Sequence, residues 1–352
     1  MNLIIKILKL KITRIILLLL FLSFVLSLFI FKGWYVKQYN KGVGFHYVNK
    51  GDNAYRNRKY QKAVDFYRAA LSHYPEHSGA SCNLGNIYVS FENYYEAVNA
   101  YENALKYSPD YISCRMDLGI ILAEKMADYD RAIQEYGKII NTNSNGIDIQ
   151  LVYNNKKTTK INKGRAYYNM GLAYRGKAVY MGDRSAFAIK YLEKARESYL
   201  EALKYLENDF DTYYNLALTE HLLGDYNDAS KNYCNAININ PENFEAHYNF
   251  ALLLRTMRKN KEALAEFEKS TMLIDASTRE NKDTYIFGIM SEIKRRILNE
   301  GGHEYLLQRI DLTSVPAEDI VYSQGKVMLS KQKEVNMKEF LKCKYTEEPE
   351  EK

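Results

Sequence analysis

The sequence has few of the residues that mark disordered chains, metal centres or redox sites. Its 352 residues include 5 prolines and 18 glycines, which argues against long disordered tracts. The 4 cysteines show no C-x-x-C spacing, so neither a zinc motif nor a redox motif is supported. H-E-x-x-H, a P-loop, a complete G-x-G-x-x-G and G-x-S-x-G are also missing. We therefore expect a protein that is not an enzyme, with no cofactor and no metal site.

The sequence also lacks a strong excess of charge of either sign. The 49 lysines and arginines against 43 acidic residues give a net charge of +6, and the two signs are interleaved along the chain. This pattern is typical of solvated helix faces rather than of a nucleic-acid footprint. We expect protein partners and a membrane, with no nucleic acid and no small-molecule substrate.

The longest apolar run is Ile15–Phe31, which contains no charged residue. A helix of that length spans about 26 Å, close to the roughly 30 Å hydrocarbon core of a bilayer. Basic and aromatic residues flank the run: Lys6, Lys9, Lys11, Arg14, Lys32, Trp34, Tyr35 and Lys37. The bulky residues of Ser27–Phe31 make a poor cleavage site, which favours an uncleaved transmembrane anchor over a cleaved signal peptide or a buried helix.

The basic excess before this run favours a topology in which the rest of the chain lies outside the cytoplasm. In a bacterium, this predicts a single-pass protein of the inner membrane with its main domain in the periplasm.

Beyond the apolar run, apolar and small residues recur with a period of about 34 residues. Ala97 follows Ala63 at this spacing, and Pro109 follows Pro75. The stretch Ser81–Pro109 shows the unit, with apolar residues at three- and four-residue steps on either side of a short turn. It predicts two amphipathic helices that end before the proline.

Six copies of this unit begin near Gly44, Ser78, Ile112, Gly164, Phe210 and Phe244. With their early glycine, their alanine and tyrosine in the second helix and their late proline, the copies resemble the tetratricopeptide repeat (TPR) family. The resemblance implies an all-α fold, a TPR α-solenoid of about six helix-turn-helix repeats in a right-handed superhelix, with the first helices lining a concave groove.

The repeats divide the chain into six segments. These are an N-terminal basic segment with the transmembrane helix and a linker (1–43), repeats one to three (44–144), an insertion loop (145–163), repeats four to six (164–275), a capping helix (276–300) and a C-terminal helical tail with an acidic disordered end (301–352). The insertion is either a surface loop or a partner-binding element. Repeat four carries a further insertion between Gly171 and Ala195. Short helices are expected over Ser314–Met328 and Glu334–Cys343.

Aligned repeats place one residue of each first helix at the same inward-facing slot. That slot holds Asn49, Asn83, Asp117, Asn169, Asn215 and Asn249, and the preceding slot holds Tyr168, Tyr214 and Tyr248 in the last three repeats. An asparagine offers an acceptor and two donors, which suits the backbone of an extended peptide, and tyrosine adds contact area. The resemblance therefore implies a peptide-binding groove at these asparagines and tyrosines. In the alternative interpretation the asparagines bond only to the neighbouring helix.

A variant of the family clamps a C-terminal carboxylate with lysine and arginine. The first three repeats carry Val48, Asp52, Asn83, Ser113 and Asp117 at the slots concerned, and only Asn83 agrees with the clamp. The two acidic groups would repel a carboxylate. That function is rejected.

Two cysteines, Cys82 and Cys114, fall at nearly equivalent places on neighbouring first helices. They are either a disulfide or two packed thiols, whereas Cys234 and Cys343 are expected to be unpaired.

The sequence as a whole predicts a membrane-anchored scaffold or adaptor that binds an extended peptide or helix of a partner protein in its groove. Such a protein would assemble or position an envelope complex. One alternative is a non-catalytic structural subunit of a large membrane-associated assembly, and another is an accessory subunit of an enzyme complex.

Overall fold

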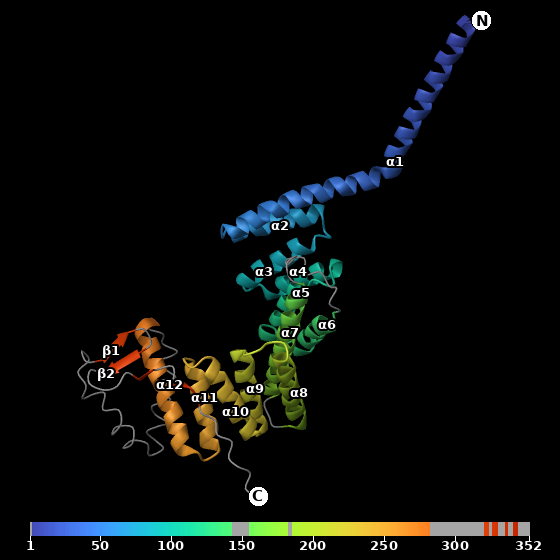
Figure 1. Cartoon of the computed structure of the whole chain (residues 1–352). Helices are drawn as coiled ribbons and strands as arrows, with labels where there is room; N and C mark the ends of the chain where they lie inside the picture. The colour runs from blue at the N-terminus through green and yellow to red at the C-terminus, as the bar shows by residue number, and fades with distance from the viewer. Residues whose placement is uncertain are drawn as a thin grey trace. The chain divides into compact units, whose positions relative to one another are not determined.

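The computed structural model describes residues 2–142, 155–181, 185–281, 320–323, 326–329, 335–336 and 341–343. Its helices are α1 (Asn2–Arg56), α2 (Tyr60–His73), α3 (Ser78–Ser90), α4 (Tyr94–Tyr107), α5 (Ile112–Glu124), α6 (Tyr129–Asn141), α7 (Asn155–Tyr180), α8 (Ala186–Leu203), α9 (Phe210–Leu223), α10 (Tyr226–Ile239), α11 (Phe244–Thr256) and α12 (Asn260–Asn281) (Figure 1). Three short strands follow: β1 (Ile320–Ser323), β2 (Lys326–Leu329) and β3 (Val335–Asn336).

The chain forms two compact units, Met1–Ile121 and Leu122–Lys352, which we call the N-terminal and C-terminal units. In the N-terminal unit α1 packs against α2, α2 against α3 and α3 against α4. In the C-terminal unit each helix from α6 to α12 packs against the next one along the chain. Packing between consecutive helices is the arrangement that the repeat period predicts, so the all-α repeat fold is confirmed.

The core of the array is one repeated pair of buried side chains on the second helices. An alanine at most 2% exposed occupies the first position in Ala63, Ala97, Ala132, Ala195, Ala229 and Ala263. An aromatic residue four positions later is also at most 2% exposed: Tyr67, Tyr101, Tyr136, Tyr199, Tyr233 and Phe267. Residues four apart share one helix face, and each buried ring contributes on the order of 2 kcal/mol.

The glycine of the first helix makes room for this ring. A Cβ atom placed on Gly51, Gly85 or Gly171 would lie within 2.6 Å of the tyrosine ring of the same repeat. No side chain fits at that distance without a shift of the ring, so the early glycine of the repeat is a packing requirement.

Local signals explain where several helices begin and end. Asp209 and Asn243 accept hydrogen bonds from the backbone amides of Thr212 and Ala246 at 3.0 and 2.8 Å, which caps α9 and α11. Gly224 ends α9 in the left-handed conformation, at φ 90°. This backbone geometry costs glycine little, because glycine has no Cβ.

The insertion differs from its prediction as a loop. Residues 155–163 belong to α7, which is 26 residues long, and residues 145–154 lie outside the described part of the chain. The further insertion in repeat four lengthens the helices on both sides of the turn, since α7 runs to Tyr180 and α8 has 18 residues. The loop prediction was wrong for residues 155–163 because an interruption of the period was equated with an interruption of the helix.

The predicted short helix over Ser314–Met328 is wrong where the structure describes it, and so is the start of the one over Glu334–Cys343, although Leu341 within that range is helical. β1 and β2 pair as an antiparallel hairpin in which Val321 lies opposite Met328, and β3 pairs with β2. The two runs are rich in β-branched and aromatic residues and are separated in sequence by Gln324 and Gly325, which is a hairpin signal. Of the capping helix expected over residues 276–300, residues 276–281 belong to α12 and the rest lies outside the described residues. The acidic end at 347–352 also lies outside them.

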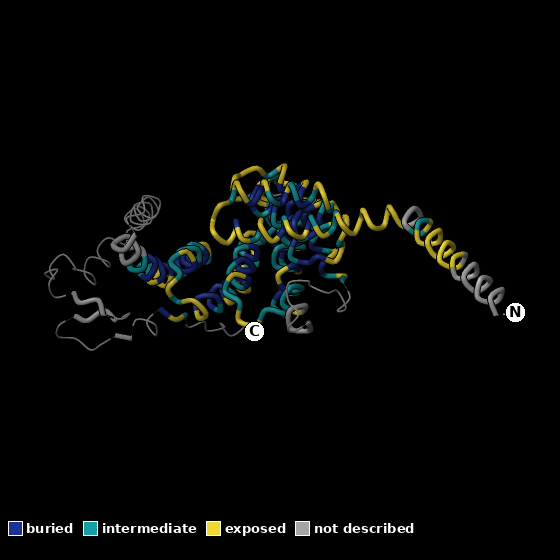
Figure 2. Tube along the Cα trace, turned by 90° about the horizontal axis from the view of Figure 1, so that it is seen from above, coloured by how far each residue is buried: buried dark blue, intermediate teal, exposed yellow. Residues whose placement is uncertain are grey.

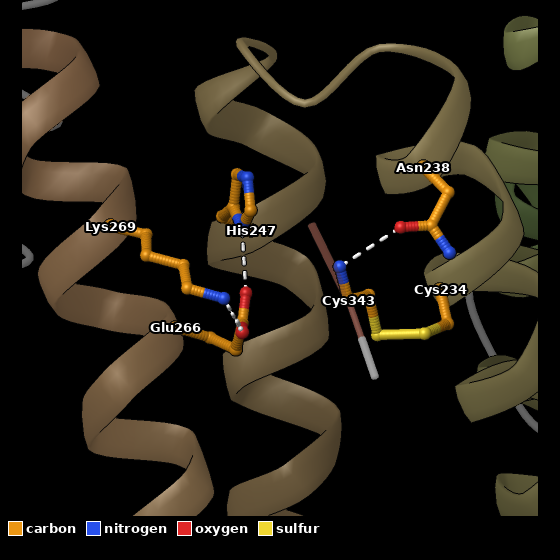
Figure 3. Close-up of a disulfide and its surroundings, with 6 residues drawn as sticks. All are labelled: Cys234, Asn238, His247, Glu266, Lys269 and Cys343. Atoms are coloured by element: carbon orange, nitrogen blue, oxygen red, sulfur yellow. Dashed lines mark hydrogen bonds and ion pairs between the residues drawn. A yellow bond between two sulfur atoms is a disulfide. The ribbon is translucent and has the colours of Figure 1, made fainter. Parts of the chain in front are cut away.

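All four cysteines form disulfides. Cys82 on α3 bonds Cys114 on α5, with 5.8 Å between their Cα atoms, which selects the disulfide over packed thiols. Cys234 on α10 bonds Cys343, with 5.2 Å between Cα atoms, so the expectation that these two are unpaired was wrong. Figure 3 shows this second bond, beside which the Cys343 amide donates to Oδ1 of Asn238 at 3.0 Å.

A buried charged cluster joins α11 to α12 near this disulfide (Figure 3). His247 is 0% exposed, and its Nδ1 lies 2.5 Å from Oε2 of Glu266 while its Nε2 lies 2.9 Å from the carbonyl oxygen of Pro241. Lys269 donates to Oε1 of Glu266 at 2.7 Å. Burial alone would raise the pKa of Glu266, but the His247 hydrogen bond and the two positive charges outweigh it and lower that pKa.

The apolar stretch of α1 has no packing partner among the described residues. Its side chains from Ile16 to Leu22 are 50–64% exposed, and Figure 2 shows this part of the helix as exposed. The hydroxyls of Ser23 and Ser27 donate to the carbonyls of Leu20 and Phe24, at 2.8 and 2.6 Å. Within the described residues, no single helix passes for a membrane span by length and hydropathy. One pair of segments bent by 57°, Ile16–Ser27 and Phe31–Arg56, passes on length and composition.

Candidate functional site

The first helices of the C-terminal unit are linked by a ladder of tyrosine and asparagine side chains. Nδ2 of Asn215 on α9 donates to the hydroxyl of Tyr168 on α7 at 3.2 Å. One repeat later, Nδ2 of Asn249 on α11 donates to the hydroxyl of Tyr214 on α9 at 2.7 Å. We call the surface that carries Tyr168, Tyr214, Asn215, Tyr248 and Asn249 the ladder face. The structure thus brings together residues that the sequence placed at two adjacent slots.

The asparagine amides of the ladder face are largely used within the protein. The second Nδ2 proton of Asn215 goes to the carbonyl oxygen of Asp211 at 2.8 Å, and that of Asn249 goes to the carbonyl oxygen of Glu245 at 3.0 Å. Oδ1 of Asn215 accepts from Arg175 at 2.8 Å. One Nδ2 proton of each asparagine thus bonds the first helix of the preceding repeat, and the other bonds the asparagine's own helix.

The tyrosine rings are the half-buried part of the face. Burial is the first cause that raises the pKa of Tyr168 and that of Tyr214, each to about 12, so both hydroxyls stay protonated at neutral pH. Tyr214 stacks on Phe210 with 5.7 Å between ring centroids, and Tyr248 packs on Phe267 at 5.8 Å. Rings held by hydrogen bonds and stacking present apolar area with little freedom left to lose.

The remaining slot residues have different surroundings. In the N-terminal unit Asn49 is exposed, whereas Asn83 is half-buried and its Nδ2 lies 3.3 Å from both Oδ1 of Asp52 and the hydroxyl of Tyr67. Asp117 in the same unit is half-buried, and burial raises its pKa to about 6. Asn169 on α7 is half-buried in the C-terminal unit. The hydrogen bonds described here for slot residues of the predicted ladder are those of Asn83, Asn215 and Asn249.

Arg175 on α7 is a ladder-face residue that the sequence interpretation missed. Its guanidinium binds Asn215. Burial raises the pKa of four surrounding tyrosines, and the charge of Arg175 partly offsets that rise. Those tyrosines are Tyr168, Tyr199, Tyr214 and Tyr233. A signal was present, because Arg175 and Arg255 both stand four residues after the small residue of their first helix, Gly171 and Ala251.

Within the described residues, no group of three or more histidine, cysteine, aspartate or glutamate side chains is arranged to hold a metal ion. What the ladder face offers is aromatic area, hydroxyls and one guanidinium.

Comparison with family models gives matches over three windows of the chain. A model described as a tetratricopeptide repeat matches residues 48–110 and 82–145, and a model described as a TPR repeat matches residues 218–256. No curated protein matches the chain in sequence.

Solved structures share the fold. A structure titled as the functional characterisation of Pseudomonas aeruginosa pilF is 15% identical with a TM-score of 0.50, over 73% of this chain and 99% of that one. The assembly chaperone of RpL4, Acl4, is 14% identical with a TM-score of 0.55, over 74% and 99%. At these identities the likeness concerns the fold alone.

Proposed function

Because the chain belongs to the tetratricopeptide repeat family, we propose that it is a membrane-anchored scaffold whose ladder face binds a segment of a partner protein. Arrays of this family are protein-interaction scaffolds that bind peptides or proteins. The finer proposal is that this chain holds its partner at a membrane and so assembles or positions a complex of the cell envelope.

The observation that carries the proposal is the ladder itself. Tyr168 and Tyr214 are fixed by hydrogen bonds from the next repeat, so successive first helices present rings at a regular interval. Such a row suits an extended segment, because a pre-ordered surface loses little side-chain entropy on binding. Among the described residues, Oδ1 of Asn249 accepts no hydrogen bond, which leaves it available to a backbone amide of a bound segment.

The exposed apolar part of α1 supports the anchor. Seven consecutive side chains from Ile16 to Leu22 face outwards, and each exposed apolar side chain buried in lipid contributes roughly 1.5–3 kcal/mol. The hydroxyls of Ser23 and Ser27 are satisfied within the helix, as a lipid environment requires. An anchored scaffold raises the local concentration of a partner on the same membrane and compensates for weak affinity.

The disulfides support an extracytoplasmic location for the repeats. Both join segments of the repeat region or its C-terminal extension, Cys82 with Cys114 and Cys234 with Cys343. Disulfides persist in oxidising compartments and are rare in the cytosol. In a bacterium this corresponds to the periplasmic side of the inner membrane.

A structural subunit is the second candidate, and one surface favours it. The end of α7 and the start of α8 expose Val179, Tyr180 and Phe187 to 62%, 76% and 68%. Exposed apolar side chains that gather at one place mark interaction surfaces. A subunit that used this end of repeat four would contact its partners away from the ladder face.

The proposal is tested by removing the two amides that position the tyrosines. The double substitution Asn215→Ala and Asn249→Ala is expected to lower the recovery of co-purifying membrane partners by about tenfold, since two positioned contacts of about 0.7 kcal/mol each are lost. Recovery is measured by quantitative mass spectrometry of the full chain purified from membranes.

A matched control replaces two exposed asparagines of second helices, Asn99 on α4 and Asn227 on α10, with alanine. It should leave recovery unchanged. Equal recovery from the ladder variant and the control, with native helical content in both, would contradict the proposal.

A further inference from the structure

Arg175 is a cation on the ladder face without an anionic partner. Its Nη2 donates to Oδ1 of Asn215, and no carboxylate among the described residues lies within salt-bridge distance of its guanidinium. A half-buried guanidinium is costly to leave unpaired, so its position indicates a missing counter-charge.

Two buried hydroxyls beside Arg175 also lack an acceptor. The hydroxyls of Tyr199 and Tyr233 are inaccessible and make no hydrogen bond of normal geometry among the described residues. Both side chains are 0% exposed. Burial raises the pKa of both, and the charge of Arg175 partly offsets the rise in each, while in Tyr199 Arg175 also acts as a nearby donor. Buried hydroxyls in proteins almost always have a hydrogen-bond partner, so two unpaired buried hydroxyls near one cation need an explanation.

The N-terminal unit shows what such a tyrosine normally bonds. The hydroxyl of Tyr67 donates to Asp52 on α1, and that of Tyr101 donates to Asn86 on α3, each at 2.6 Å. The equivalent first-helix positions in repeats four and five are Leu172 and Leu218, which cannot accept a hydrogen bond. The sequence therefore lacks the internal acceptor in repeat four, which carries Arg175, and in repeat five.

The direction of these hydroxyls follows from the same repeat. The hydroxyl of Tyr67 also lies 3.3 Å from Nδ2 of Asn83, the slot asparagine of the next repeat. By the repeat symmetry, Tyr199 points towards Asn215, which is the residue that Arg175 binds. The cation and the Tyr199 hydroxyl therefore converge on one part of the ladder face, and the charge of Arg175 also reaches Tyr233.

We propose that Arg175, together with the hydroxyls of Tyr199 and Tyr233, forms a subsite for the carboxylate of an aspartate or glutamate side chain in the bound protein segment. The ligand carboxylate supplies the missing counter-charge for Arg175. It also supplies the missing acceptor for the tyrosine hydroxyls, once the guanidinium turns towards the carboxylate and the hydroxyls become accessible. The inference rests on the proposed function, because it names the chemistry that the ladder face selects in its partner. It differs from the C-terminal carboxylate clamp rejected above in its residues and in its ligand.

The test uses an array of short peptides of mixed sequence, attached through their C-termini so that no terminal carboxylate is free. Each spot fixes one central residue as Glu, Asp, Gln or Asn, and a further set presents the Gln peptides with a free C-terminal carboxylate. The full chain in detergent micelles is applied as the wild type, as Arg175→Gln and as Arg175→Lys. Lys190→Gln, an exposed cation on α8, is the charge-matched control.

We expect the wild type and Lys190→Gln to bind the Glu and Asp spots about fivefold more than the Gln and Asn spots, as for one partly exposed ion pair. Arg175→Gln should lose this preference while it binds the Gln spots as the wild type does, and Arg175→Lys should keep part of it. An acid preference that survives Arg175→Gln would overturn the inference, as would a wild type that binds all spots equally or selects only the free C-terminus. A wild type that binds no spot would instead remove the proposed function and the inference with it.

Discussion

Replacement of His247 by alanine is expected to lower the free energy of unfolding of the α11–α12 pair by about 3 kcal/mol, the lower end for breaking a buried ion pair. The substitution leaves Glu266 7% exposed without the donor that lies 2.5 Å away, and it leaves the carbonyl of Pro241 without its donor. It also opens a cavity where a ring was fully buried. Native-state hydrogen exchange of α11 and α12 measures the change.

The comparison variant is His247→Gln, which keeps one donor. Its free energy of unfolding should fall by roughly half as much as that of His247→Ala, because one of the two hydrogen bonds remains possible.

Unfolding in acid provides a second test of the cluster. The pKa of Glu266 is lower in the folded protein than its ordinary value of 4.5, so its contribution is present above that value and is lost as the pH falls through the folded pKa. The acid-induced loss in α11 and α12 should therefore shrink in Glu266→Gln. An identical acid response in that variant would contradict the role assigned to the cluster.

Loss of the Cys82–Cys114 disulfide is expected to lower the free energy of unfolding of α3–α5 by about 3 to 4 kcal/mol. The bond closes a loop with a sequence separation of 32 residues, and both cysteines are at most 3% exposed. Its removal frees the unfolded chain and leaves two small gaps between neighbouring first helices. The change is measured by hydrogen exchange of the Cys82→Ala, Cys114→Ala double variant.

The matched control removes the other disulfide, with Cys234→Ala and Cys343→Ala, and should leave exchange in α3–α5 unchanged because its cysteines belong to the other unit. Reductant applied to the wild type should reproduce the first double variant in α3–α5. Protection that is the same in all three samples would show that this bond does not stabilise the unit.

The repeat period was enough to locate most helices. Ser81–Pro109 predicted two helices and a stop, and the structure places α3 at Ser78–Ser90 and α4 at Tyr94–Tyr107. The spacing succeeded because small and aromatic residues recur where the hairpin must pack closely, as Gly85 does against Tyr101. Interruptions of the period were less informative, since the insertion in repeat four extended two helices rather than a loop.

The spacing of residues along the sequence did not predict contacts between residues that are far apart in the sequence. The bond between Cys234 and Cys343 spans a separation of 109 residues, and nothing in the local sequence of either cysteine points to the other. The β1–β2 hairpin was missed for a different reason, because a short helix was assigned across Gln324 and Gly325 without weighing their turn preference.

The candidate site was predicted in part. The slots of Tyr168, Asn215 and Asn249 followed from the alignment of the repeats, but their mutual hydrogen bonds depend on the distance between neighbouring first helices. Arg175 was missed because it lies outside the two slots that the family resemblance emphasised. Its proposed role depends on its surroundings, where Leu172 and Leu218 replace the hydrogen-bond acceptors of other repeats. That replacement matters only once the positions of the buried tyrosines are known.

The most direct test of the central claim is photo-crosslinking in intact membranes. A photoreactive amino acid is placed at Tyr168, Tyr214 or Tyr248 on the ladder face, and at Leu200 on α8, which is 46% exposed, as an outer-face control. If the ladder face binds a protein segment, the three ladder positions will crosslink to the same partner segment and Leu200 will not. Crosslinks to partners from Leu200 or from the exposed end of α7, with none from the three tyrosine positions, would contradict the account.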